Sequence, residues 1–473
     1  MTRIRRCVAL PLLLVACSQD PPISGDDSSD TGGGSTQAPL PTTGPDDTTG
    51  ATASTSGEAS GDGSTAAGST GPAPDPVCGD GVVEGDEPCD DGIDEPDDGC
   101  DSQCARTGVP IWTQSWDGGA NEPDEGDAVR TGAGGDIFVA GSVGRADNFA
   151  DAIVRRLDAN GVEQAQYVYA GALGLNDYGR ALALDDTGGV VLGGLEYLVD
   201  DQTTQAFVRR FAADGEVTWT YTQASPYVLG TSAIFGAAAS GDAIYVSGVE
   251  EVAQEVREIY VHRLDPADGQ PVWTVTLPDA HASGVQGLAI APNGDVILAS
   301  ATVDAEGTPT PVIVRLAPAD GAEIWNRSYD ESAGYARAAA VHPDGDLAIV
   351  GTRFNANGDR DVWTARLTGE GDELWSDIYD HDMDEDLGGA VAWSPAGDLY
   401  VGGFVRPAGK VSDAFVRRYT GAGEVVWTST YDDEAGGLDA ALGVAADASR
   451  VVVVGVDVVL GSDFNQWIRV YEP

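Results

Sequence analysis

The chain has 473 residues and a formal net charge of −52, because 25 Lys and Arg stand against 77 Asp and Glu. Such an excess of negative charge repels phosphate backbones, so no nucleic-acid partner is expected. It favours cationic ligands, or divalent metals held by carboxylates, but solubility in salty surroundings is the simpler interpretation.

Residues 1–16 have the features of a secretory signal: three Arg within the first six positions, then the apolar run Val8–Ala16. That run is shorter than the ~20 apolar residues needed to span a bilayer. Leu14-Val15-Ala16-Cys17 resembles the lipobox of bacterial lipoproteins, in which the signal peptidase cuts before the Cys and its thiol carries diacylglycerol. This resemblance implies a lipid anchor at Cys17 and a place in the cell envelope, at the outer membrane or cell surface. An ordinary signal peptide with a chance Cys is the alternative.

Residues 17–76 follow as a linker of Ser, Thr, Gly, Asp and Pro with almost no large apolar side chain. A stretch of this composition cannot bury enough surface to offset its chain entropy. It is therefore predicted to be a disordered tether between the lipidated Cys and the body of the protein.

Residues 77–105 form a Cys-rich module with the spacing C-x10-C-x10-C-x3-C, made by Cys78, Cys89, Cys100 and Cys104. Four cysteines in so short a secreted segment predict two disulfides of open connectivity, and the spacing fits zinc poorly. The segment resembles the short Cys-rich repeat of myxobacterial surface proteins, a family with no settled activity. Calcium binding is a minor alternative for its carboxylates, Asp80, Asp90, Asp91, Asp97 and Asp98.

Residues 108–473 are periodic. A Gly followed four residues later by a Trp recurs at Trp112, Trp219, Trp273, Trp325, Trp375 and Trp427, with Ala165 in the one remaining Trp place. A turn marker before an apolar run recurs every 51 to 53 residues, at Asp136, Gly189, Asp242, Asp295, Asp346, Asp398 and Arg450. A period near 50 built of short strands is typical of propeller blades. We therefore predict an all-β, monomeric, seven-bladed β-propeller of four-stranded blades.

Each unit contains four strand-like runs; in the sixth they are GGAVAWSP, GDLYVGGF, DAFVRRYT and EVVWTSTY. The first run is poor in bulky residues in every unit, as expected of an innermost strand crowded around a channel. The fourth carries the Trp, expected to pack between adjacent sheets. The last unit ends without a Trp strand, and residues 108–116 at the other end of the domain are predicted to supply it and close the ring.

The runs DAFVRRYTGAGEVVWTSTY and GGAVAWSPAGDLYVGGF resemble the SBBP-type bacterial propeller repeat. That resemblance implies a propeller and a secreted or surface location, without a defined reaction. RLDPADGQPVWT and RFAADGEVTWT also resemble the docking repeat of quinoprotein dehydrogenases. Those enzymes have eight blades and commonly an adjacent Cys pair beside the quinone, whereas this chain has seven units and no Cys after Cys104.

Two recurrent charged features are candidates for sites. The third strand repeats an Arg, at Arg156, Arg210, Arg263, Arg315, Arg366 and Arg418, which is expected to pair with nearby carboxylates rather than form a ring for an anionic ligand. The loops before the inner strands are acidic, and their carboxylates are candidate Ca²⁺ ligands: Asp380, Asp382, Asp384, Asp386, Asp432 and Asp433. A solvated acidic face is the simpler interpretation of these loops.

No G-x-S-x-G, H-E-x-x-H or P-loop pattern occurs, and the four His are scattered among the units. The sequence therefore predicts a non-enzymatic envelope lipoprotein whose propeller presents a binding face to an extracellular protein or glycan, with Ca²⁺ the one cofactor considered. The alternative is a periplasmic or surface enzyme, a hydrolase or a quinone-type oxidoreductase, with its site in the channel. Propeller active sites are assembled from separate blades, so missing local motifs do not exclude it.

Overall fold

The computed structural model describes Val83, Cys89, Asp90, Gly99, Cys100 and residues 106–473, apart from 121–122, 148, 199–202, 229, 255, 278–286, 305, 382–384, 408–410, 433–436 and 459–463. Cys17, Cys78 and Cys104 lie outside these residues, whereas Cys89 and Cys100 are joined by a disulfide. The helical content of the described chain is the short 3-10 turn Ala133–Gly135, so none of its helices could cross a membrane.

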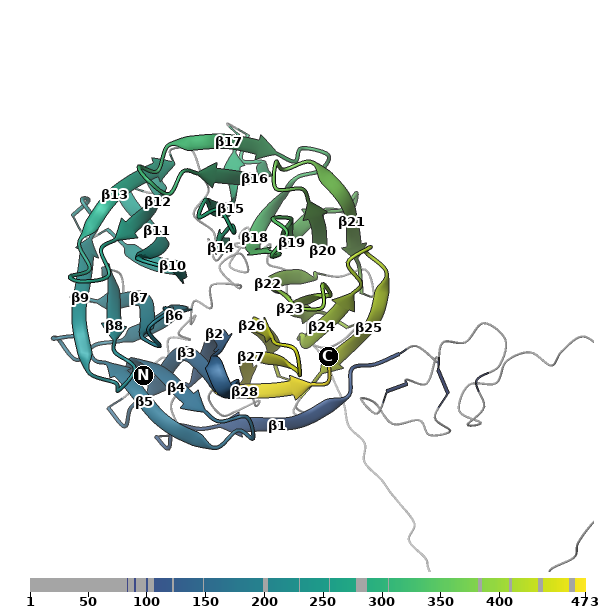
Figure 1. Cartoon of the computed structure of the whole chain (residues 1–473), viewed down its shortest axis with the longest axis horizontal. Helices are drawn as coiled ribbons and strands as arrows, with labels where there is room; N and C mark the ends of the chain where they lie inside the picture. The colour runs from purple at the N-terminus through teal and green to yellow at the C-terminus, as the bar shows by residue number, and fades with distance from the viewer. Residues whose placement is uncertain are drawn as a thin grey trace, which may run out of the picture. The chain divides into compact units, whose positions relative to one another are not determined.

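Seven four-stranded antiparallel sheets stand around a central axis, as Figure 1 shows, and confirm the predicted propeller. In blades one to six the strands follow chain order from the axis outward. The inner strands are β2 (Glu125–Thr131), β6 (Asp177–Leu184), β10 (Ser232–Ser240), β14 (Gly287–Ile290), β18 (Gly334–Val341), β22 (Leu387–Trp393) and β26 (Asp439–Ala446). The second strands are β3 (Ile137–Gly144), β7 (Val190–Tyr197), β11 (Ala243–Ala253), β15 (Val296–Val303), β19 (Leu347–Phe354), β23 (Leu399–Val405) and β27 (Val451–Val458).

The third strands are mostly buried, whereas the outermost strands alternate between more and less exposed residues. The third strands are β4 (Ala150–Leu157), β8 (Thr204–Phe211), β12 (Val256–Leu264), β16 (Pro309–Leu316), β20 (Arg360–Leu367), β24 (Asp413–Tyr419) and β28 (Phe464–Tyr471). The outermost strands are β5 (Glu163–Tyr169), β9 (Val217–Ala224), β13 (Pro271–Leu277), β17 (Glu323–Ser328), β21 (Glu373–Tyr379), β25 (Val425–Tyr431) and β1 (Pro110–Trp116).

The last blade is completed by the first strand. β1 pairs with β28 from Pro110 opposite Tyr471 to Trp116 opposite Gln466, so the sheet order is β1-β28-β27-β26. The predicted closure by residues 108–116 is therefore confirmed. Because an N-terminal strand lies in the C-terminal blade, that blade has four strands like the others and β28 is not left as an edge.

The hydrophobic core lies between neighbouring sheets rather than at the axis. One cluster joins Phe138 and Val154 of blade one to Leu192 and Phe207 of blade two, and comparable clusters join other neighbouring blades. Second strands such as Leu399–Val405 are buried along their whole length, because a sheet on either side covers them. This agrees with their almost continuously apolar sequences.

The repeated Gly and Trp meet across the blade interfaces. Gly269 of blade three lies over the indole of Trp219 in blade two, and a side-chain carbon on Gly269 would clash with that ring. Gly269 also has φ +73°, a conformation that favours glycine. The same contact recurs for Trp112, Trp273, Trp325, Trp375 and Trp427, each under the glycine of the next blade. In blade one, Tyr167 lies under Gly215, which compensates for Ala165 in the Trp place.

The third-strand arginines make ion pairs, as the simpler interpretation predicted. In five blades the guanidinium contacts an Asp of the turn between the first two strands, at 2.5–2.8 Å: Arg156–Asp136, Arg210–Asp185, Arg315–Asp295, Arg366–Asp346 and Arg418–Asp398. In blade seven, where Val470 replaces the arginine, Arg450 of the turn contacts Asp447 at 3.3 Å. In these five blades the pair locks the turn to the third strand.

Three buried aspartates hold the loops on the opposite face. Asp124 accepts hydrogen bonds from the backbone N–H of Gly118 and Gly144, and Asp386 accepts them from the N–H of His381 and Arg406. Asp177, at the corresponding place in blade two, accepts one from the N–H of Gly171. Burial raises the pKa of Asp124, and it raises the pKa of Asp177 and Asp386 to about 7. Part of the predicted acidic face is therefore structural.

We expect a chain that begins at Asp117 to be much less stable than one that begins at Arg106. The shorter chain lacks β1, so β28 becomes an open edge and Trp112 no longer packs against Gly161. Loss of a packed Trp alone costs ~3–5 kcal/mol. Thermal unfolding of the two truncated chains checks this, and equal melting temperatures would contradict the closure.

We also expect the propeller to lose stability as the pH rises from about 4 to 7. Asp177 and Asp386 keep their protons up to about pH 7 when folded, whereas the reference pKa of an unfolded Asp is 3.8. Each buried carboxyl of this kind therefore lowers the free energy of unfolding by up to ~1.4 kcal/mol per pH unit across that window.

The measurement is the melting temperature against pH in high salt, which screens the repulsion among surface charges. The double variant Asp177→Asn/Asp386→Asn should show a flatter profile than the parent chain. The carboxyls whose pKa is lowered, such as those of Asp185 and Asp447, titrate below this window. A parent profile as flat as that of the variant would be the opposite result.

Candidate active site in the channel

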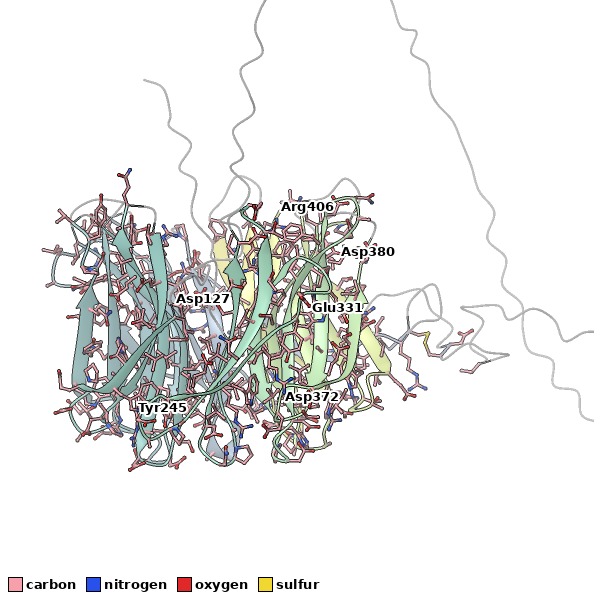
Figure 2. The ribbon with its side chains drawn as sticks, turned by 90° about the horizontal axis from the view of Figure 1, so that it is seen from above. Asp127, Tyr245, Glu331, Asp372, Asp380 and Arg406 are labelled. Atoms are coloured by element: carbon pink, nitrogen blue, oxygen red, sulfur yellow. A yellow bond between two sulfur atoms is a disulfide. The ribbon has the colours of Figure 1, made fainter. Side chains whose placement is uncertain are left out.

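The inner strands share a one-residue bulge that faces the channel. In six blades the pairing of the inner with the second strand skips one residue: Asp127, Arg180, Phe235, Arg337, Gly389 or Leu442. A bulge redirects the side chain of the extra residue. We call these six residues the bulge ring, and all except Arg337 line the central cavity. Figure 2 shows Asp127 between the two faces of the propeller.

A glycine in the second strand accompanies each bulge. A side-chain carbon on Gly141 would clash with the carbonyl oxygen of Glu125, and Gly194 and Gly351 stand in the same relation to Tyr178 and Tyr335. In blade four, where the inner strand is described only from Gly287 onward, the residue at the position of this glycine is Ser300. In the six blades with a described bulge, the glycine therefore makes room for the inner strand.

The channel is narrow at this level. Ala128, Ala181, Gly236, Ala338 and Ala390 are among the residues that line a cavity of about 70 Å³. The small side chains that the sequence analysis expected in the innermost strands are therefore confirmed. The cavity has room for a small polar group, but not for a large ligand.

One arginine and two carboxylates from two blades form a buried cluster beside this cavity. Arg180 of blade two contacts Glu125 Oε2 at 2.7 Å and Asp127 Oδ1 at 2.6 Å, both in blade one. The three side chains are at most 4 % exposed. Arg180 also lies over the ring of Tyr178, at 4.9 Å from its centre.

Two carboxylates that share one guanidinium leave one negative charge unbalanced. Burial, and then the charge of Glu125, raise the pKa of Asp127 to about 7, although Arg180 opposes the change. Asp127 Oδ2 and Glu125 Oε1 are buried without a hydrogen-bond partner among the described residues. Asp127 is therefore suited to take up or release a proton near neutral pH.

Blade five places a second arginine at the position of Arg180. Arg337 is 4 % exposed and lies over Tyr335, 5.6 Å from the ring centre. Burial, and then the nearby Arg360, lower its pKa to about 10, and none of the described carboxylates contacts it. Its Nε has no hydrogen-bond partner in the described chain. A buried cation in this state favours an anionic ligand.

The residues singled out from the sequence lie elsewhere. The six Trp lie at the blade interfaces, and Asp386 ties two loops together. Asp380 is on the same face as Arg406 in Figure 2. Asp382, Asp384 and Asp433 are outside the described residues, and among those described no three potential metal ligands converge. The calcium site, which also involves Asp432, therefore stays a prediction.

Asp127 and Arg337 did not stand out in the sequence analysis. Asp127 lies in β2. One signal in the sequence could have identified the bulge ring. It is a charged residue in an inner strand rich in small side chains, such as Arg180 in YGRALAL and Arg337 in YARAAAV.

No protein-family model matches this chain, and comparison with curated proteins gives no relative. Solved structures do resemble it. They include a quinohemoprotein alcohol dehydrogenase from Comamonas testosteroni (10 % identity, TM-score 0.43, 76 % of each chain covered). A protein of unknown function from Dyadobacter fermentans matches at 11 % identity and a TM-score of 0.47, covering 77 % of this chain and 98 % of that one.

A third similar structure is a putative oxidoreductase (glucose dehydrogenase) from Thermus thermophilus (19 % identity, TM-score 0.37, 62 % of this chain and 96 % of that one). At these sequence identities, the similarity shows the fold alone. The named functions among these structures are those of dehydrogenases, which differ from the non-enzymatic protein with a binding face that the sequence analysis predicted. Asp127 and Arg180 come from different blades, so no local motif in the sequence marks this cluster.

A quinone cofactor, which the name quinohemoprotein implies, does not fit the cavity of the bulge ring. That cavity is about 70 Å³, far below the ~300 Å³ at which pockets for cofactor-sized ligands begin. The Trp side chains lie between blades, under the glycine turns, instead of in the channel. No step of a reaction is therefore assigned to such a group here.

Proposed function

We propose that the protein is an enzyme whose reaction takes place at the bulge ring, with Asp127 as the proton acceptor. The observation that carries this proposal is the pKa of about 7 of a carboxyl that is 3 % exposed and faces the channel. A general base is most effective when its pKa lies near the working pH. Arg180 holds Asp127 in place and offsets part of its charge.

Arg337 supports a small anionic substrate. Its guanidinium does not line the cavity, but none of the described carboxylates balances its buried charge, which therefore favours an anionic substrate nearby. The cavity volume of about 70 Å³ favours a molecule of a few heavy atoms. We therefore propose oxidation of a small 2-hydroxy acid: the hydroxyl proton passes to Asp127, and the hydride of the hydroxyl-bearing carbon passes to a diffusible two-electron acceptor that contacts the substrate from the channel outside the cavity.

The test is an assay of the purified chain with small 2-hydroxy acids and a redox dye as acceptor, with small esters in parallel. Rates should rise with pH through about 7, because Asp127 must lose its proton to act as a base. Asp127→Asn should lower kcat by ~10²-fold or more and remove that pH dependence. Arg337→Gln should mainly raise KM.

Asp386→Asn is the matched control, since Asp386 is an equally buried carboxyl with a raised pKa that serves only to tie loops. It should retain activity. Turnover of esters alone would replace oxidation by hydrolysis at the same site. Full activity in Asp127→Asn, or no turnover of either class, would contradict the proposed site.

We further propose that the protein is held to the cell envelope by a lipid on Cys17. The lipobox Leu14-Val15-Ala16-Cys17 supports this, together with the linker and the Cys-rich module that follow it. Cys17→Ser should move the protein from the membrane fraction to the soluble fraction. Cys7→Ser is the control, because Cys7 belongs to the segment that the peptidase removes. A Cys17→Ser protein that still sediments with membranes would contradict the anchor.

A further inference from the structure

Blade three departs from the ion pairs that lock the turns of other blades. Arg263 and Asp242 occupy the usual positions, but the nearest approach of guanidinium and carboxylate is 3.8 Å. The corresponding distance is 2.5–2.8 Å in the five blades with a close pair. The carboxylate of Asp242 is 97 % exposed, whereas the Arg263 side chain is only 22 % exposed.

The length of the turn explains the difference. In blade four, Ile290 pairs with Val296, so five residues form the turn and its last residue, Asp295, reaches back to Arg315. In blade three, Ser240 pairs with Ala243, which leaves a turn of two residues. Asp242 is therefore at the tip of the hairpin, and its carboxylate points into solvent instead of toward Arg263.

Arg263 is consequently an arginine without a close acceptor in the described chain. Its Nε is buried without a hydrogen-bond partner among the described residues, as is that of Arg418, but the carboxylate nearest to the Arg263 guanidinium is 3.8 Å away. The strand pairing places Arg263 directly beside Tyr245, which is 2 % exposed. Blade six has the same pair of residue types, Arg418 beside Tyr400, but there Asp398 lies 2.8 Å from the guanidinium.

A hollow of about 270 Å³ lies at this place, between blades three and four. Asp242, Tyr245 and Arg263 line it from blade three, and Ile290, Gly294 and Pro318 from blade four. Figure 2 shows Tyr245 near the face opposite the one that carries Arg406 and Asp380, with Asp127 between the two faces. The hollow is therefore distinct from the bulge ring.

We propose that this blade-three hollow binds a small organic carboxylate, whose charged group takes the place that a turn Asp takes in the other blades. Arg263 receives the carboxylate, because a guanidinium presents a planar set of donors that matches two carboxylate oxygens. Ile290, Pro318 and the ring of Tyr245 contact an apolar body. The volume of about 270 Å³ limits the ligand to a small molecule.

The negative charge of the whole chain limits the affinity of this site for an anion. A net charge of −52 repels anions at long range, so affinity must come from direct contact in the hollow. At ~0.15 M salt the screening length is about 8 Å, which leaves the contact with Arg263 and removes most of the distant repulsion. We expect millimolar binding that weakens little as salt is raised.

The experiment is calorimetric titration of the full chain with benzoate, which joins a carboxylate to an apolar ring, at near-physiological salt. Saturable binding is expected for benzoate, with none for benzyl alcohol, which lacks the charge, and weaker binding for inorganic phosphate. Arg263→Gln should weaken benzoate binding at least about tenfold. Arg418→Gln is the matched control and should bind benzoate as the parent does, because Asp398 already occupies that guanidinium.

A second variant keeps Arg263 and places an Asp carboxylate of the chain itself against its guanidinium. Replacing the Gly241-Asp242 turn by the five-residue sequence Ala-Pro-Asn-Gly-Asp of Ala291–Asp295 should restore the ion pair, raise the melting temperature and abolish benzoate binding. Benzoate binding that survives in both variants, or no saturable binding to the parent chain, would overturn the proposal. None of these outcomes depends on Asp127, so the proposed enzymatic function is tested separately.

Discussion

The distance between neighbouring blades depends on one contact, the glycine turn of each blade over the large aromatic side chain of the blade before it. Gly269 over Trp219 and Gly423 over Trp375 are two examples. A side-chain carbon at these glycines would push the sheets apart. Because seven such contacts share one ring, any change in spacing would also widen or narrow the channel. The cavity volume of about 70 Å³ at the bulge ring therefore depends on the glycine–aromatic contacts at the periphery of the molecule.

Those features of the fold that repeat were predictable from the sequence. The Gly and Trp markers gave the number of blades, and the missing last strand of blade seven gave the closure by residues 108–116. The small inner strands and the ion pairs of the third-strand arginines were predicted as well. Each of these follows from a local pattern that occurs six or seven times, so a single irregular unit does not obscure it.

The candidate sites were not predictable because they break the repeat. Asp127 meets Arg180 across two blades, 53 residues apart, which no local motif reveals. Asp242 fits the turn marker in sequence, yet its turn is three residues shorter than that of Asp295 and sends the carboxylate outward. Absence of local motifs was accordingly a poor argument against an enzyme.

The position of β1 in the last blade has a consequence for how the chain folds. Pro110 pairs with Tyr471, so the contact that completes the ring joins the two ends of the domain and cannot form before the whole propeller sequence is present. Contacts so distant in sequence carry a high loop-closure cost and slow folding. Until then β28 stays an exposed edge, open to pairing with another chain. The strong negative charge of the chain keeps such incomplete rings apart.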